Sequence, residues 1–205
     1  ERNWQYAEQF PVETESQVRA RRLSLELGIE PVSRSVAAHL SSLTVLTGAQ
    51  SICEIGTGVG VSGLALLRHS PEATLTTLDV EAEYQRQAKA MFAEAVIPAA
   101  RTRLIAGVAA QVLPRMNLGS YDLVLIDANP EALLEYLERA LTIVRLGGTI
   151  VIPNALWRGR VPDPAARDGL TADFRALLSA VVNSPAILPV LSPAGDGLLT
   201  LTRIG

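Results

Sequence analysis

Two segments near the start of the chain carry apolar side chains at helical spacing. Residues 12–27 and 32–47 each end at a glycine, which is typical of a helix C-terminus, and we predict a helix for both. The apolar side chains of the first helix can cover the chain's own helices or contact a second subunit, and both interpretations stay open. These side chains are Val12, Val18, Leu23, Leu25 and Leu27.

From residue 51 onward, short apolar segments alternate with helical ones. Nearly continuous apolar runs such as Tyr121–Ile126 are typical of strands that are buried on both faces. Helices of about 10 to 15 residues between such strands indicate right-handed crossovers and a parallel sheet. The predicted strands are 51–55, 73–78, 102–105, 121–126 and 148–152, and the predicted helices are 59–68, 81–95, 109–116, 131–144 and 165–182.

The end of the chain departs from this alternation. The apolar runs 187–191 and 198–202 are joined by the short segment SPAGDG, which leaves no room for a crossover helix. We therefore predict that these two strands form an antiparallel hairpin. The whole chain, 1–205, is predicted to be one α/β domain, with an N-terminal helical cap at 1–48 and a ligand-binding core at 49–205.

Composition and charge narrow the class of protein. Apolar residues make up 48% of the chain and charged residues 19%, which indicates a folded core rather than disorder. No apolar run approaches the ~18 residues that cross a bilayer. A net charge of −3 offers no basic surface for nucleic acid, and the single cysteine excludes a disulfide framework. We expect a cytoplasmic protein with neither a membrane nor a nucleic-acid partner.

A glycine-rich turn follows the first predicted strand. Gly56, Gly58 and Gly60 alternate with other residues between the strand and the next helix. Because glycine tolerates positive φ and has no Cβ, a ligand can approach the backbone closely here. Asp79 ends the following strand, 23 residues after Gly56, where a carboxylate can accept hydrogen bonds from both hydroxyls of a ribose. The pattern predicts a nucleoside site.

The same turn also fits the dinucleotide fingerprint G-x-G-x-x-G, which begins at Gly58 and would predict a nicotinamide-dependent reductase. In that motif the first glycine directly follows the strand, whereas here Gly56 occupies that place. Glu54, at the strand end, would repel a diphosphate and attract a cationic group. The only lysine, Lys89, has no tyrosine four residues before it. We therefore favour a nucleoside with a positively charged appendage.

Four segments taken in order resemble the S-adenosylmethionine-dependent methyltransferases: CEIGTGVGVSGLALL, YDLVLIDA, LGGTIVIPNALWRGRV and GDGLL. From about residue 30 onward the chain is similar to the small O-methyltransferases typified by catechol and caffeoyl-coenzyme A O-methyltransferases and their bacterial relatives. The resemblance implies a Rossmann-like, seven-stranded sheet in the order 3-2-1-4-5-7-6, with strand 7 antiparallel. It also implies methyl transfer to a hydroxyl of a small, catechol-like molecule by a homodimer.

The resemblance implies roles for individual residues. Asp79 would hold the ribose of S-adenosylmethionine with Val80 beside the adenine, and Ser62 would bind the carboxylate of the methionine part. Asp127, at the end of the fourth strand, would lie between methyl donor and acceptor and is the candidate catalytic residue. The set implied to contact the cofactor is Val32, Glu54, Gly56, Thr57, Gly58, Ser62, Asp79, Val80, Ala109 and Asp127.

Candidate acceptor contacts are Asp127, Asn129 and Trp157. Trp157 belongs to a proline- and arginine-rich segment, 153–169, which we interpret as an exposed loop on the ligand-binding edge of the sheet. Its indole can stack on an aromatic acceptor, and packing within the loop is the alternative.

The chain departs from the family at the metal site. Relatives hold a divalent cation with one Asp after the fourth strand and an Asp-Asn pair after the fifth, and place a Lys three residues beyond the first Asp. Asp127 and Asn154 are present here, but Pro153 replaces the second Asp and Pro130 replaces the Lys. Asp127 and Asn154 remain a candidate magnesium site that has lost a carboxylate. We expect little or no metal dependence or a changed acceptor; a cofactor-binding protein without catalysis is the alternative.

Overall fold

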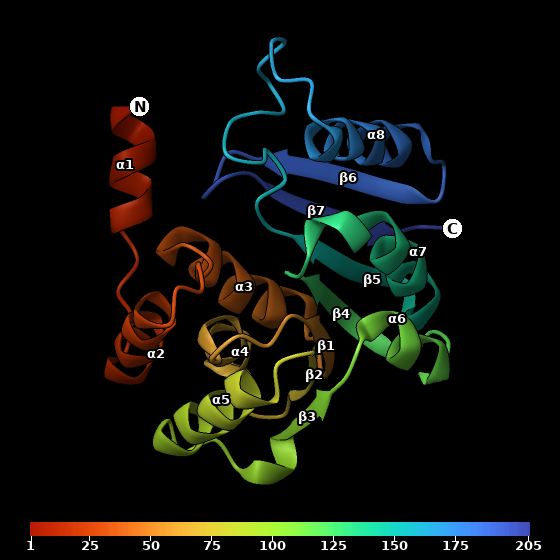
Figure 1. Ribbon diagram of the computed structural model, residues 1–205. Coiled ribbons are helices and arrows are strands. Elements are labelled where there is room, and N and C mark those ends of the chain that lie inside the picture. Colours follow the sequence, from red (N-terminus) through yellow and green to blue (C-terminus); the bar gives the residue numbers. More distant parts are fainter.

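The computed structural model describes residues 1–205 and contains one seven-stranded sheet, in the order β3-β2-β1-β4-β5-β7-β6 (Figure 1). The first five strands are parallel, and β7 runs antiparallel to both β5 and β6. The predicted strand order and the terminal hairpin are confirmed. The strands are β1 (Ser51–Ile55), β2 (Thr74–Asp79), β3 (Thr102–Ala106), β4 (Tyr121–Ile126), β5 (Val144–Ile152), β6 (Ile187–Ser192) and β7 (Leu198–Arg203).

Helices cover both faces of this sheet (Figure 1). None of them combines the length and the apolar character needed to cross a bilayer. The α-helices are α1 (Arg2–Gln9), α2 (Glu15–Glu26), α3 (Arg34–Thr47), α4 (Val61–Leu67), α5 (Ala82–Glu94), α6 (Ala109–Val112), α7 (Leu133–Ile143) and α8 (Gly169–Asn183), and the short 3-10 helices are η1 (Ala99–Arg101), η2 (Leu113–Arg115) and η3 (Pro130–Ala132).

Two hydrophobic clusters, one on each face of the sheet, form the core. Helices α3, α4 and α5 enclose a cluster of 21 buried residues that includes Phe92, and α7 and α8 enclose one of 22 that includes Phe174. Successive side chains of a strand point to opposite faces. Ile52 therefore belongs to the first cluster, and Cys53 and Ile55 belong to the second. This two-sided burial explains why the central strands are apolar throughout.

The predicted ends of helices and strands differ from the observed ones mainly where a helix cap or a strand pairing sets the end of the element. Tyr121–Ile126 is correct at both ends. Helix α8 begins at Gly169, four residues later than predicted, because the Asp168 side chain caps it by accepting a hydrogen bond from the Thr171 backbone N–H. Strand β5 begins at Val144, four residues earlier than predicted, where Val144 pairs with Tyr121 across a register irregularity.

Helix α1, which the apolar pattern does not predict, is fixed by the far end of the chain. The Trp4 indole Nε1–H lies 3.1 Å from the backbone oxygens of both Pro193 and Gly195. The Glu8 carboxylate accepts a hydrogen bond from the Gly195 N–H at 2.6 Å. These contacts join α1 to the β6–β7 connection, and no residue of α1 is buried.

Helix α2 packs mainly through small and polar side chains, together with the partly buried Leu23. Its buried residues are Gln17, Ala20 and Ser24, and it contacts α4 and α5. Val18 and Leu25 are exposed by 43% and 62%. The chain's own helices are therefore covered by α2, while much of its apolar surface still faces outward.

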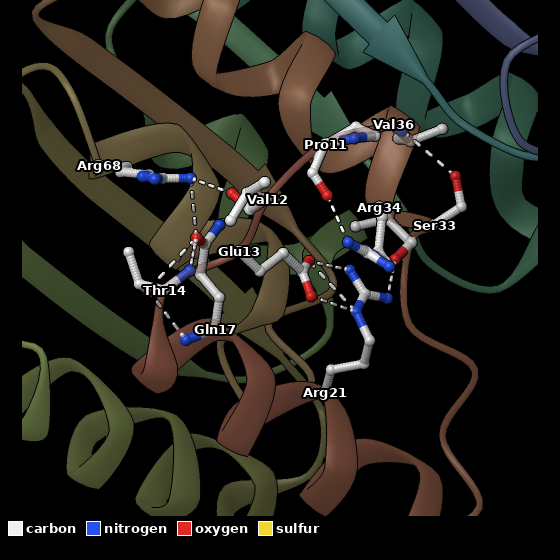
Figure 2. Close-up of polar contacts among 11 residues, drawn as sticks. Pro11, Val12, Glu13, Thr14, Gln17, Arg21, Ser33, Arg34, Val36 and Arg68 are labelled. Atoms are coloured by element: carbon white, nitrogen blue, oxygen red, sulfur yellow. Dashed lines mark hydrogen bonds and ion pairs between the residues drawn. The ribbon is translucent and has the colours of Figure 1, made fainter. Parts of the chain in front are cut away.

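A buried ion pair ties α2 to its neighbouring loops (Figure 2). Arg21 Nη2 lies 2.6 Å from Glu13 Oε1, and the Glu13 side chain is only 5% exposed. Arg21 Nη1 also donates to the backbone oxygen of Val32 at 2.5 Å, which fixes the α2–α3 connection. Arg34 donates to the backbone oxygen of Pro11 on the preceding segment. The segments before and after α2 are thus held by arginine side chains.

Replacing Glu13 with alanine is expected to lower the free energy of unfolding by about 3 kcal/mol, because Arg21 would lose the counter-charge of a mostly buried pair. Urea denaturation at pH 7 measures the loss. Glu83→Ala is the matched control, since its ion pair with Arg86 is exposed and is worth less than about 1 kcal/mol. Equal losses in the two variants would contradict the assignment.

Candidate functional site

A cavity of about 230 Å³ opens where β1, β2 and β4 end. It lies beside the point where the strand order reverses between β1 and β4, the place where open parallel sheets bind ligands. Ten of the residues implied by the resemblance line it: Val32, Gly56, Thr57, Gly58, Ser62, Asp79, Val80, Ala109, Asp127 and Asn129. The structure thus brings together residues from the turn after β1, the end of β2, α6, the loop after β4 and the α2–α3 connection.

The glycine turn forms the floor of this cavity. Gly56, Gly58 and Gly60 have φ values of +98°, +52° and +97°, which side chains rarely adopt. A Cβ on Gly56 would lie 1.8 Å from the backbone oxygen of Asp127, and one on Gly60 would lie 3.2 Å from the Phe92 ring. Glycine is therefore required both for the turn itself and for its close packing on β4 and α5.

Asp79 is oriented by backbone donors on both of its oxygens. Oδ2 accepts a hydrogen bond from the Gly58 N–H and Oδ1 accepts one from the Glu81 N–H, both at 3.0 Å. The carboxylate is half-buried and lines the cavity. Because these bonds fix its position, its remaining lone pairs can accept hydrogen bonds from a ligand.

Glu54 lies beneath the floor rather than in the wall. The side chain is completely buried and does not line the cavity, in contrast to the direct contact implied by the resemblance. It accepts hydrogen bonds from the hydroxyls of Ser62 and Thr77, the latter at 2.6 Å. Burial raises the pKa of Glu54 to about 8 and outweighs the lowering effect of the two hydroxyl donors, and the charges of Asp127 and Asp79 add smaller increases. Without a bound cation, Glu54 is mostly protonated at pH 7.

Asp127 is the charged residue at the end of β4. Its backbone N–H donates to the Ile55 oxygen at 2.9 Å, which holds the loop against the end of β1. Burial and the nearby charge of Glu30 raise the pKa of Asp127 to about 6. At pH 7 its carboxylate is therefore mostly ionised yet more basic than an ordinary aspartate, as a general base requires.

Several lining residues were not predicted from the sequence. The α2–α3 connection contributes Ile29, Glu30 and Pro31, and two tyrosines, Tyr84 of α5 and Tyr136 of α7, complete the walls. The tyrosines lie on helices whose apolar faces look like ordinary core surface in the sequence. No motif distinguishes them, so only the packing of the helices identifies them.

Trp157 and Asn154 lie outside the cavity lining. The Trp157 ring is half-buried and stacks on Phe174, with 5.1 Å between ring centroids, so the indole is engaged in packing. Asn154 has φ +58°, and its backbone oxygen accepts a hydrogen bond from the Trp157 N–H at 3.0 Å. Of the two interpretations left open for the indole, packing is the one seen here, although its partner Phe174 belongs to α8 and not to the loop.

The residues present do not fit the divalent cation of the relatives. The chain contains no group of three His, Cys, Asp or Glu side chains that could hold a metal ion. Asp127 lines the cavity without Asn154, and the buried Pro153 has no carboxylate to contribute. Magnesium is commonly held by one or two carboxylates together with water and substrate oxygens, and of the three positions expected to hold it only Asp127 both carries a carboxylate and lines the cavity.

Raised carboxyl pKa values make stability fall as pH rises. A carboxyl group whose pKa is higher in the folded state binds more protons there, so the free energy of unfolding decreases between its unfolded and folded pKa values. We expect the Glu54→Gln variant to lose the decrease in the free energy of unfolding between pH 6 and 8. The Asp127→Asn variant should show a smaller decrease in that free energy between pH 4 and 6. Urea denaturation across pH 4–8 without cofactor checks this, at roughly 1.4 kcal/mol per pKa unit. An unchanged slope in Glu54→Gln above pH 6 would refute it.

Comparisons with known proteins agree with this site. The family model described as O-methyltransferase matches residues 12–204. A Mycobacterium avium protein, named as a proposed O-methyltransferase, is 45% identical over 185 residues, which cover 90% of this chain and 83% of that protein. A crystal structure of a Corynebacterium glutamicum protein has a TM-score of 0.90 at 28% identity, covering 98% of this chain and 94% of that one.

A further structure includes the cofactor that the resemblance implies. The O-methyltransferase TomG from Streptomyces achromogenes, involved in tomaymycin synthesis and solved in complex with S-adenosylmethionine, has a TM-score of 0.86 at 25% identity and covers 100% of this chain and 98% of that one. These matches decide against the dinucleotide interpretation of the glycine turn. The chain belongs to the S-adenosylmethionine-dependent O-methyltransferase family.

Proposed function

We propose that the protein transfers the methyl group of S-adenosylmethionine to a hydroxyl of a small aromatic molecule. The observation that carries this proposal is a single cavity lined both by the nucleoside-type residues Gly56 and Asp79 and by the basic carboxylate of Asp127. One cavity can thus hold methyl donor and acceptor next to a proton acceptor. The cofactor supplies an electrophilic methyl group on a sulfonium.

The cofactor-binding roles follow from the contacts around the turn. Asp79, fixed by two backbone N–H groups, accepts hydrogen bonds from the ribose hydroxyls. Val80, which is 62% exposed, and Ala109 border the adenine. Ser62 lines the cavity next to the buried Glu54, and its hydroxyl is the proposed partner of the methionine carboxylate. All four of these cofactor-binding residues line the cavity, which supports the proposal.

Asp127 is the proposed general base. Its carboxylate accepts the proton of the acceptor hydroxyl while the hydroxyl oxygen forms a bond to the methyl carbon and the carbon–sulfur bond breaks with its electron pair on sulfur. Asp127 then releases the proton to water. General bases of this kind typically contribute about 10²- to 10⁴-fold to a rate. Ile29 and Tyr136 supply apolar surface around the reacting groups and limit access of water.

The reaction we propose does not rest on a divalent cation. In the relatives that use one, the cation lowers the pKa of the acceptor hydroxyl, and a neighbouring lysine is also present. Here Pro153 and Pro130 occupy the corresponding positions, and Asp127 is the only one of the expected metal ligands that lines the cavity. Deprotonation is therefore assigned to Asp127 itself.

Asp127→Asn is expected to lower kcat by about 100-fold or more, because an amide cannot accept the proton. In the wild type, kcat should rise with pH through about 6 as Asp127 ionises. Initial rates with catechol acceptors measure both, and calorimetry checks that S-adenosylmethionine still binds the variant. Asp173→Asn, on the exposed side of α8, is the control. Undiminished kcat in Asp127→Asn would exclude the base role, and complete loss of wild-type activity on chelation would exclude metal independence.

We also propose that the protein forms a homodimer through its N-terminal helices. Phe10, Val12 and Leu46 are exposed by 74%, 77% and 79%, and they border a groove of about 460 Å³ between the α1–α2 connection and α3. Large apolar side chains exposed beside one groove are typical of an interface.

Light scattering at micromolar concentration is expected to give twice the chain mass of 21.9 kDa. Leu46→Glu should shift the species toward the monomer by placing a charge among the exposed apolar side chains of the groove, whereas Leu118→Glu, at an exposed position outside that groove, should not. A wild-type mass of one chain would overturn the dimer.

A further inference from the structure

The cavity carries charge of one sign only. Its charged lining residues are Glu30, Asp79 and Asp127, and no arginine, lysine or histidine lines it. The position where relatives place a lysine near the acceptor is Pro130. The only charged side chains that a bound molecule can contact in the cavity wall are therefore carboxylates.

Two of the three carboxylates, Glu30 and Asp127, are not assigned to the ribose. Asp79 already accepts backbone hydrogen bonds at the turn and is assigned to the ribose. Glu30 and Asp127 remain, and the charge of Glu30 is felt at Asp127, since it contributes to the raised pKa there. An acceptor in the cavity thus meets the charge of two carboxylates, one after β4 and one on the exposed α2–α3 connection.

The counter-charge available to Glu30 is weak. Arg158 Nη2 lies 3.6 Å from Glu30 Oε2, and the two side chains are 70% and 76% exposed, so solvent screens the pair. Arg158 also makes two contacts away from Glu30. Its guanidinium lies 5.4 Å from the Trp157 ring centroid, and its backbone N–H donates to Asp196 at 2.5 Å. Arg158 does not line the cavity.

We propose that the acceptor carries a cationic amine in addition to its hydroxyl, and that Glu30 is the residue that selects this amine over a carboxylate. The inference rests on the proposed function, since it specifies the acceptor of the same cavity. An ammonium group near Glu30 gains an attractive interaction, whereas a carboxylate there meets two like charges and no cation of the cavity wall. Amine-bearing acceptors are bound, and acidic ones are rejected.

Three catechols that differ only in the charge of the side chain test this: 4-(2-aminoethyl)catechol, 4-ethylcatechol and 4-(2-carboxyethyl)catechol. The wild-type kcat/KM should decrease in that order, with roughly a tenfold difference between the amine and the acid, as expected for a partly screened charge pair. Equal values, or a preference for the acid, would overturn the proposal.

Two variants assign the preference to Glu30. Glu30→Gln should lower the amine-to-acid ratio of kcat/KM, because it removes one of the two carboxylates that face the acceptor. Arg158→Gln should increase that ratio, because it removes the partial counter-charge of Glu30. An unchanged ratio in Glu30→Gln would show that the selection, if present, does not come from this residue and would overturn the assignment.

Binding separates this inference from the proposed reaction. Calorimetry with the protein saturated by S-adenosylhomocysteine measures the affinity of the three catechols without turnover. If cofactor binds but none of the three is methylated, the proposed aromatic hydroxyl acceptor is wrong, and the order of affinities still decides the charge preference. Tighter binding of the amine than of the acid supports the inference; equal or reversed affinities, or no binding of the amine, overturn it.

Discussion

The missing side chain at Gly56 is the constraint on which the site depends. A Cβ there would overlap the backbone oxygen of Asp127, so only glycine lets the end of β1 pass this close to the end of β4. The turn is also bonded to both neighbouring strands: the Gly56 N–H donates to the Leu78 oxygen at 2.8 Å, and the Asp127 N–H donates to the Ile55 oxygen at 2.9 Å. Three strand ends are thereby drawn around one space, and Asp79 and Asp127 face it together.

The buried acid below that turn favours binding of a cationic ligand but lowers the stability of the fold. Glu54 is fully buried, has hydroxyl partners but no cation, and carries a pKa of about 8. An apolar side chain of similar volume would avoid the cost of burying an acid. A ligand that brings a positive sulfur and an ammonium group lowers that cost, because a nearby cation favours the ionised carboxyl. Cofactor binding and folding are consequently linked, since a ligand that binds only the folded state stabilises it.

Local patterns predicted most of the fold and much of the site. The strand order and the terminal hairpin followed from spacing and resemblance, and every implied cofactor residue except Glu54 lines the cavity. These residues belong to the strand ends and turns that carry the motif. Glu30 and Tyr136 come from a loop and a helix that tertiary packing brings to the cavity, and Trp4 fixes α1 through a contact 191 residues away with Gly195. Pairings of this kind leave no local signal.

Two proposed differences from the metal-dependent relatives are a base that works without a metal and an acceptor that carries a cation. Both follow from the loss of positive charge at the place where the acceptor is deprotonated. In relatives, a divalent cation and a lysine supply positive charge where the acceptor is deprotonated. Pro153 and Pro130 remove the second metal carboxylate and the lysine, yet Asp127 is kept, and Glu30 adds a further carboxylate to the wall. Besides the sulfonium of the cofactor, positive charge at this end can then come from a proton on Asp127, which its raised pKa favours, or from the acceptor. A carboxylate that serves as base and a cationic acceptor are therefore mutually consistent: the base needs no metal, and the amine offsets the charge that the metal would have balanced.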